Sequence, residues 1–280
     1  MSPSSHAVEI SKVCDSRCER ETDLVAAEEP LEIRVGFSLP EGRAVRSVSI
    51  TMRTPGHDEA LAAGFLFGES IIQSAGDIID IAPCGPAAPD TGHHNVVRVE
   101  LADGVAVDLG RLQRHFYTTS SCGVCGKASL EAVRALGVAP IGTSAAFPGP
   151  VLTGIPQKLR AAQAVFDETG GLHGAAAFTA AGELVVTMED VGRHNAVDKV
   201  IGQLLLDDRL PATQLGLMVS GRASFELMQK ALVAGMPLLA AVSAPSSLAV
   251  ALAKEFDMTL IGFLRGAAFN IYAGEERIVS

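Results

Sequence analysis

The sequence has no tryptophan, few aromatic residues and fewer basic than acidic residues. Lys and Arg number 22 against 32 for Asp and Glu, which gives a formal net charge of −10. Nucleic-acid binding needs a basic face, so we expect no nucleic-acid partner, although a local basic pocket is compatible with this charge. With 48% hydrophobic residues in 280, the chain is too apolar to be disordered and can form one large or two modest cores.

The chain also lacks the features of a secreted or membrane protein. Residues 1–23 are polar and contain no apolar segment typical of a secretory signal. Residues 231–253 carry no charge and are long enough to span a bilayer, but Pro237 and the Ser/Pro-rich segment 243–247 interrupt them. We therefore expect a buried α/β core, a cytoplasmic protein and no membrane partner.

The cysteines are odd in number: Cys14, Cys18, Cys84, Cys122 and Cys125. Without a signal peptide, an odd set argues against a disulfide framework and favours metal or thiol chemistry.

The order of apolar patterns predicts an α/β fold with a mixed, largely parallel sheet flanked by helices. Residues 1–28 read as a flexible leader, 29–145 as a smaller β-containing part, and 146–280 as the α/β core, with one continuous domain as the alternative. Residues 30–53 predict two strands around a Pro-Glu-Gly turn, and residues 95–109 predict a hairpin. Residues 175–189 predict a hairpin or strand pair, and after them helix and strand patterns alternate, which is typical of parallel strands covered by helices.

Cys122 and Cys125 form a C-x-x-C pair immediately before a predicted helix, Ala128–Leu136. A helix N-terminus and the adjacent Lys127 both favour the thiolate form, so a nucleophile or sulfur carrier is the first interpretation. A zinc site is the second and would need further ligands, such as Cys14 with Cys18 or His93 with His94. The third, a cysteine that only fills space, suits Cys84 better.

A second polar cluster, MEDVGRHNAVDKVIG, spans residues 188–202, where a strand ends and a helix begins. Arg193 and His194 beside a helix N-terminus can receive a phosphate or another anion. An ordinary structural role is about as well supported by the pattern.

The other polar residues of this cluster have a simpler interpretation. Asp190 or Asn195 would cap the helix, and Asp198 and Lys199 would form a solvated helix face.

Three successive strand patterns end in small, hydroxyl or arginine residues. Ser220 and Arg222 follow the first strand, Ser243 the second, and the segment 262–266 with Arg265 the third. Ligands of open α/β sheets bind outside the carboxyl ends of the strands, and arginine forks onto phosphate oxygens. These ends predict a nucleotide-like ligand, although the chain has no P-loop and no GxGxxG motif.

Taken together, the motifs are identified as those of the FdhD/NarQ family of formate dehydrogenase accessory sulfurtransferases. They occur in the order TMRTPGHDEALAAGFLFGESII, TTSSCGVCGK, MEDVGRHNAVDKVIG, SGRASFELMQKA, VSAPSSLAVALA and TLIGFLRGAAFNIY. The resemblance covers about residue 30 to the C-terminus, so Cys14 and Cys18 lie outside it.

The resemblance implies a sulfurtransferase with specific partners. Such a protein receives sulfur from a cysteine desulfurase and passes it to the molybdenum of the bis(molybdopterin guanine dinucleotide) cofactor, which formate dehydrogenase then uses. It implies a persulfide on Cys122, with Cys125 as an auxiliary thiol, and a homodimer. It also implies a core similar to the cytidine deaminase fold without its zinc ligands, so we expect no metal.

By the same resemblance, the cofactor-binding segment is Phe263, Leu264, Arg265, Gly266, Ala267 and Ala268. A guanine nucleotide such as GDP would occupy the same site, to which the residue patterns add Arg193, His194, Ser220, Arg222 and Ser243. Two alternatives stay open: a zinc-stabilised binding module, and a chaperone that holds the cofactor without handling sulfur.

Overall fold

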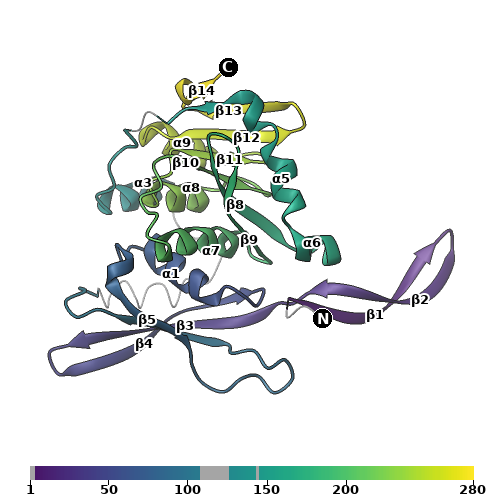
Figure 1. Cartoon of the computed structure of the whole chain (residues 1–280), viewed down its shortest axis with the longest axis horizontal. Helices are drawn as coiled ribbons and strands as arrows, with labels where there is room; N and C mark the ends of the chain where they lie inside the picture. Colours follow the sequence, from purple (N-terminus) through teal and green to yellow (C-terminus); the bar gives the residue numbers. More distant parts are fainter. Residues whose placement is uncertain (1–3, 108–125, 143–144) are drawn as a thin grey trace.

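The structure, a computed structural model, describes residues 4–107, 126–142 and 145–280. Two main sheets have helices between and beside them (Figure 1). The four-stranded sheet has the order β4-β3-β6-β5. Its strands are β3 (Glu29–Leu39), β4 (Gly42–Arg53), β5 (Ile78–Pro83, after the short helix η1, Ala75–Asp77) and β6 (Val96–Leu101).

The residues predicted as a leader instead form a β-hairpin of β1 (Ser5–Cys14) and β2 (Arg17–Ala26). Asp15 and Ser16 make the turn with φ of 47° and 66°, the left-handed geometry that suits a two-residue hairpin. The strands pair along their whole length, and the hairpin projects from the molecule (Figure 1). Because most side chains on both faces are exposed, no hydrophobic alternation revealed the strands.

The six-stranded sheet has the order β13-β12-β11-β10-β8-β9. Its strands are β8 (His173–Thr179), β9 (Leu184–Asp190), β10 (Leu215–Val219), β11 (Leu238–Ala241), β12 (Thr259–Arg265) and β13 (Ala268–Ala273). Strands β10, β11 and β12 are parallel, and the other neighbours are antiparallel. The predicted mixed α/β fold is confirmed; within this sheet the parallel pairing is confined to these three strands, and outside it β3 pairs with β6 in parallel.

Helices cover both faces of this sheet (Figure 1). One face packs against α7 (Arg193–Leu206), α8 (Phe225–Val233) and α9 (Ser247–Glu255). The other face packs against α4 (Gly149–Leu152) and α5 (Ile155–Ala161). Beside them lies a short strand pair of β7 (Phe147–Pro148) and β14 (Ile278–Val279), and the short helix η2 (Glu275–Arg277) precedes β14. Successive side chains alternate between the two cores: Leu217 faces the first and Met218 the second. Because both faces are covered, the central strands β10 and β11 are apolar at every position.

The apolar run 231–253 is divided, as expected, among the end of α8, strand β11 and the start of α9. None of the helices in the described residues is long and apolar enough to cross a membrane.

Helix α1 (Asp58–Gly68) lies between the two sheets and packs on α7. The two backbones approach closely where glycines face each other. A Cβ on Gly64 would lie 1.8 Å from the Asp198 carbonyl oxygen, and one on Gly202 would lie 1.8 Å from that of Ala60. This contact joins both sheets in one continuous hydrophobic core.

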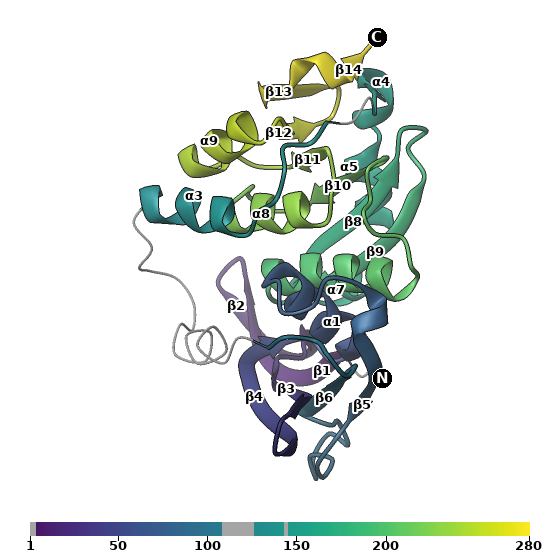
Figure 2. The ribbon, with the colours of Figure 1, turned by 90° about the vertical axis from the view of Figure 1, so that its left-hand side faces the viewer.

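Three further segments bear on the predictions. The helix expected after the cysteine pair is α3 (Gly126–Ala135), which lies beside α8 and α9 (Figure 2). In the predicted hairpin over 95–109, β6 is a strand, but residues 104–107 are not, and β6 pairs with β3 and β5. Residues 156–170 have the pattern of a single helix in the sequence, but the structure divides them between α5 and α6 (Ala164–Thr169).

Candidate functional site

A cavity of about 1000 Å³ lies at the carboxyl ends of β10, β11 and β12. Ser220 follows β10, Val242 follows β11, and Leu264 and Arg265 end β12; all four line the cavity. The rest of the lining runs from α5 to the start of β8: Pro156, Gln157, Leu159, Arg160, Ala161, Gln163, Phe166, Asp167, Gly170, Gly171, Leu172 and His173. The sheet thus places a cavity where the sequence predicts a ligand.

Arg265 is held in place in the wall of this cavity. Its Nε donates a hydrogen bond to the Val242 carbonyl oxygen at 2.8 Å, and its guanidinium carbon lies 5.9 Å from the centre of the Phe263 ring. Phe263 has a φ of 53°, within an irregularity of the β12–β13 pairing. No carboxylate of the described residues pairs with Arg265, so its charge is free to act on an anionic ligand.

Ser220 and His173 lie side by side in the sheet order, at the neighbouring ends of β10 and β8. Ser220 Oγ accepts a hydrogen bond from the Gly174 amide at 2.9 Å. Burial lowers the pKa of His173, the charge of Arg193 lowers it further, and the carboxylate of Asp190 opposes them. A neutral His173 beside Arg193 is suited to take up a proton when an anion binds.

Arg193 and His194 begin α7, but they have different surroundings. The charge of Arg193 lowers the pKa of His173, which lines the cavity. His194 Nε2 lies 2.7 Å from Glu226 Oε2 on α8, and this hydrogen bond holds the pKa of Glu226 below its usual value. The contact with Glu226 orients His194 towards α8.

Several predicted site residues are not among those that line the cavity: Arg193, His194, Arg222, Ser243, Phe263, Gly266, Ala267 and Ala268. Ser243 connects the strand ends instead, because its amide donates to the Gly221 carbonyl at 3.3 Å and its carbonyl accepts from the Phe263 amide at 3.2 Å. Arg222 is exposed beside the strand end. The cavity therefore groups Ser220, Leu264 and Arg265 of the predicted set.

Arg160, Gln163, Phe166 and His173 are among the polar or aromatic residues of the cavity that sequence reasoning missed. The first three belong to a segment that reads as one helix, and the break before α6 that turns them to the cavity has no sequence signal such as Gly or Pro. His173 begins a strand, and only the antiparallel pairing of β8 with β10 brings a strand start to the carboxyl ends.

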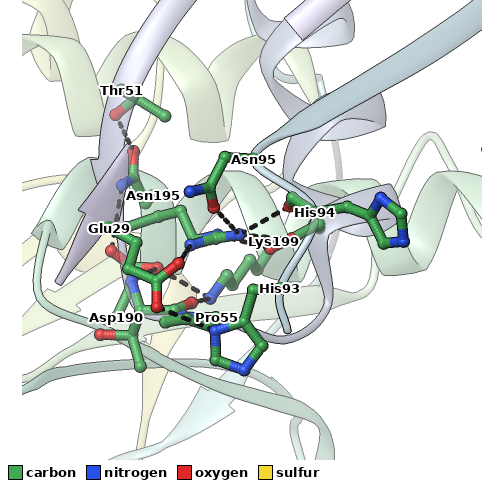
Figure 3. A network of polar contacts seen from close by, with 12 residues as sticks. Glu29, Thr51, Pro55, His93, His94, Asn95, Asp190, Asn195 and Lys199 are labelled. Atoms are coloured by element: carbon green, nitrogen blue, oxygen red, sulfur yellow. Dashed lines mark hydrogen bonds and ion pairs between the residues drawn. The ribbon is translucent and has the colours of Figure 1, made fainter. Parts of the chain in front are cut away.

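The cluster over residues 188–202 is largely structural. Lys199 Nζ lies 2.7 Å from Asp190 Oδ2 and donates to the Thr54 carbonyl at 2.9 Å. Asn195 Nδ2 donates to Asp190 Oδ1 at 3.0 Å and to the Met52 carbonyl at 2.7 Å. Figure 3 shows this network, which ties the end of β4 to β9 and α7.

The predicted solvated face of α7 is wrong. Asp198 and Lys199 are 2% and 1% exposed. Asp198 accepts a hydrogen bond from Lys230 of α8 at 2.7 Å, and α1 covers this side of the helix. The expected cap is also absent: Gly192 is the N-cap residue, and no side chain bonds to the helix as a cap. The charged residues Asp190, Asp198 and Lys199 of this motif form buried ion pairs instead.

Cys122 and Cys125 lie outside the described residues, and α3 begins at Gly126, directly after them in sequence. The other cysteines are free: Cys14 and Cys18 are exposed, and Cys84 is partly buried. Cys14 pairs in the hairpin with Arg17, and Cys18 with Val13, so the two thiols project from opposite faces.

The candidate zinc ligands are not gathered in the structure. His93 Nδ1 bonds to Glu29 Oε1 at 2.9 Å, and His94 Nδ1 lies 3.2 Å from the Gly85 carbonyl oxygen. Within residues 4–107, 126–142 and 145–280, no three His, Cys, Asp or Glu side chains are arranged to hold a metal.

Comparison with known proteins identifies the family. Residues 26–279 match the model of the FdhD/NarQ family. The chain is 52% identical over 272 residues to the sulfur carrier protein FdhD of Streptomyces avermitilis, covering 96% of this chain and 94% of that protein. The protein of the same name from Saccharolobus solfataricus is 42% identical over 270 residues, covering 96% of both chains.

A solved structure agrees with this. A crystal structure described as "a putative formate dehydrogenase accessory protein from Desulfotalea psychrophila" superposes with a TM-score of 0.75 at 26% identity, covering 99% of this chain and all of the other. By sequence and by fold, the chain belongs to the FdhD/NarQ family.

Proposed function

We propose that this chain is a sulfur carrier, a sulfurtransferase that serves formate dehydrogenase. It accepts sulfur from a cysteine desulfurase as a persulfide on Cys122 and passes it to the molybdenum of the bis(molybdopterin guanine dinucleotide) cofactor. The proposal is supported by 52% identity with a protein named for sulfur carriage and by a formate dehydrogenase accessory protein of the same fold. The observation that carries its cofactor part is the cavity at the strand ends with Arg265, which no carboxylate of the described residues neutralises.

To accept sulfur from the donor, Cys122 needs only to be a thiolate. The Cys122 thiolate attacks the terminal sulfur of the donor persulfide, a new S–S bond forms on Cys122, the donor S–S bond breaks, and the donor cysteine leaves as a thiolate. The helix that starts at Gly126 follows the cysteine pair, and a helix N-terminus stabilises a nearby thiolate.

Release of the bound sulfur as sulfide requires two electrons. Cys125 is three residues from Cys122, and its thiolate supplies them by attacking the Cys122 sulfur, which forms a Cys122–Cys125 disulfide and frees the terminal sulfur as sulfide. A cellular thiol then restores the dithiol. Cys125 therefore acts after loading.

The cavity holds the guanine nucleotide portion of the cofactor or free GDP. Its volume of about 1000 Å³ is at the upper end for a single ligand site. Arg265 faces the phosphates, and Ser220 and His173 lie beside them. On a chain of net charge −10, these groups provide the local basic pocket that an anion needs.

Intact mass spectrometry tests sulfur carriage directly. After incubation with a cysteine desulfurase and cysteine, the wild type and the C14S/C18S variant should gain 32 Da per added sulfur, and C122A should not. C125A should load but fail to release sulfide. Loading of C122A would contradict the assignment, and a C122A variant that still activates formate dehydrogenase in cells would favour the sulfur-independent chaperone. If metal analysis of the purified protein finds stoichiometric zinc, and mutation of Cys122 or Cys125 removes it, the result would favour the zinc-stabilised binding module.

A further inference from the structure

The β1–β2 hairpin Ser5–Ala26, which we call the arm, has no role in the proposed function. The residues that match the family model begin at Ala26, so the family resemblance reaches only the last residue of the arm. Most of the arm projects from the molecule, but its base, where β1 begins and β2 ends, lies against α6 (Figure 1). Helix α6 is also part of the cavity wall. The arm therefore contacts an element that a bound ligand contacts too.

Two contacts join the base of the arm to this wall. Ser5, which is only 4% exposed, donates a hydrogen bond from its Oγ to Glu168 Oε2 at 3.4 Å. A Cβ on Gly171 would lie 3.3 Å from the Ala26 Cβ, so the arm packs directly on the backbone that follows α6. Gly171 lines the cavity, whereas Ser5, Ala26 and Glu168 do not. The backbone at Gly171 therefore has the arm on one side and the cavity on the other.

Helix α6 has little stability of its own. It has six residues, none of them buried, and it adds none to the hydrophobic cores of the described residues. Its first amides, those of Val165 and Phe166, donate to the Glu189 carboxylate at 3.0 and 2.9 Å, and Arg160 of α5 pairs with Asp167. The arm holds the other end. A helix this short is unstable alone, and segments with few buried contacts open locally at low cost, so these surface contacts keep α6 in place.

A ligand in the cavity depends on the same folded wall. Four residues of α6 and the turn after it line the cavity: Phe166, Asp167, Gly170 and Gly171. A bound ligand gains contacts with these residues only while α6 is in place, and the docked arm favours that same state. When two groups stabilise one local structure from different sides, each strengthens the binding of the other, and the coupling is reciprocal.

We propose that the arm regulates ligand binding: docked on α6, it stabilises the cavity wall and so tightens the hold of the cavity on its ligand. Detachment of the arm loosens the wall and favours release. The inference rests on the proposed nucleotide site and describes its regulation. It requires no contact between the arm and the ligand.

Hydrogen exchange of the full chain tests the reciprocity of this coupling. Saturating GDP should slow amide exchange in residues 164–171 and also at the base of the arm, in residues 5–7 and 24–26, although no arm residue lines the cavity. The tip of the arm, residues 12–19, should exchange as before. Protection of residues 164–171 without protection of the arm base would overturn the inference.

Substitutions at the contact test the opposite direction. E168A removes the acceptor of Ser5 and should weaken GDP about twofold to fivefold in calorimetry, although the loss of a negative charge would by itself strengthen the binding of an anion. A26L, which overfills the space against Gly171, should weaken GDP at least as much and accelerate exchange in residues 164–171. A7L, the same change at an exposed position of the arm, should leave both unchanged. An unaltered GDP affinity in E168A and A26L would contradict the coupling.

Thermal unfolding separates this local effect from a global one. Because Glu168 is exposed and belongs to neither hydrophobic core, E168A should unfold at the temperature of the wild type without ligand. A marked fall would show that the contact stabilises the whole fold, and it would overturn a regulatory role. E168A keeps the inference testable if A26L fails to fold.

Failure of the inference and failure of the proposed function give different results. If GDP binds but neither its affinity nor the exchange data depend on the arm, only the regulatory role is lost. If no nucleotide binds to the wild type, both this role and the cofactor part of the function are lost, while sulfur loading on Cys122 is judged separately by its mass.

Discussion

The Lys230 ammonium donates a hydrogen bond to the Asp198 carboxylate at 2.7 Å, although both side chains are at most 9% exposed. This pair connects α8 to α7 beneath α1. Breaking a buried pair from one side leaves an uncompensated charge and costs more than the pair contributes.

We therefore predict that K230M lowers the free energy of unfolding by about 3 to 5 kcal/mol. The double variant D198L/K230M should recover much of the loss, because it leaves no buried charge. Chemical denaturation of the four proteins of this cycle measures both effects. A double variant as unstable as K230M would show that the loss arises from packing instead.

The K230M deficit should also depend on pH. Burial raises the pKa of Asp198, and Lys230 opposes that rise. Without Lys230 the folded-state pKa rises further above the unfolded value, so the folded state binds a proton that the unfolded state releases. The deficit should therefore shrink as pH falls from about 7.5 to about 5, and a constant deficit would contradict a buried carboxylate.

The contact between Gly64 and Gly202 should tolerate no side chain. A Cβ on either residue would lie 1.8 Å from a backbone oxygen of the facing helix, which cannot move aside as a side chain can. We predict that G64A and G202A each destabilise the protein by about 3 kcal/mol or more. G154A is the matched control: Gly154 has helical φ and ψ, and its Cβ would come no closer than 3.5 Å to another residue, so thermal unfolding should change little.

Arg265 and Arg222 should differ in their effect on nucleotide binding. Arg265 lines the cavity and Arg222 does not, although both follow strand ends. We predict that R265A weakens GDP about tenfold or more and R222A less than about twofold, because only Arg265 forms a charge-assisted bond with phosphate. Calorimetry at constant salt compares them, and equal losses would mean that only overall charge matters.

GDP binding should be linked to protonation of His173. Burial and then Arg193 hold the pKa of His173 below its ordinary value in the free protein, with Asp190 opposing and His194 adding to the effect. A bound phosphate raises that pKa, so binding takes up a proton and the affinity increases as pH falls. The ratio of affinities at about pH 6.5 and about pH 8 should be smaller in H173Q; an unchanged ratio would exclude His173 as the linked group.

The sequence determined the elements of the six-stranded sheet other than β13, and the helices on one of its faces. Strands such as Leu238–Ala241 are apolar throughout because both faces are buried, and the apolar residues of α7 recur at helical spacing. The carboxyl ends of three parallel strands follow from this order alone, so Ser220 and Arg265 were predicted together. These features depend on the local pattern of apolar and polar residues, which a single sequence is enough to show.

Tertiary structure decided the rest. The hairpin Ser5–Ala26 is exposed on both faces, so its pairing left no hydrophobic periodicity. Asp198 and Lys199 look like solvated charges until α1 and α8 cover them. The far wall of the cavity, with Gln163 and His173, exists because a helix breaks and an antiparallel strand turns its start towards three strand ends. Such positions depend on which segments meet in space, and no short stretch of sequence carries that information.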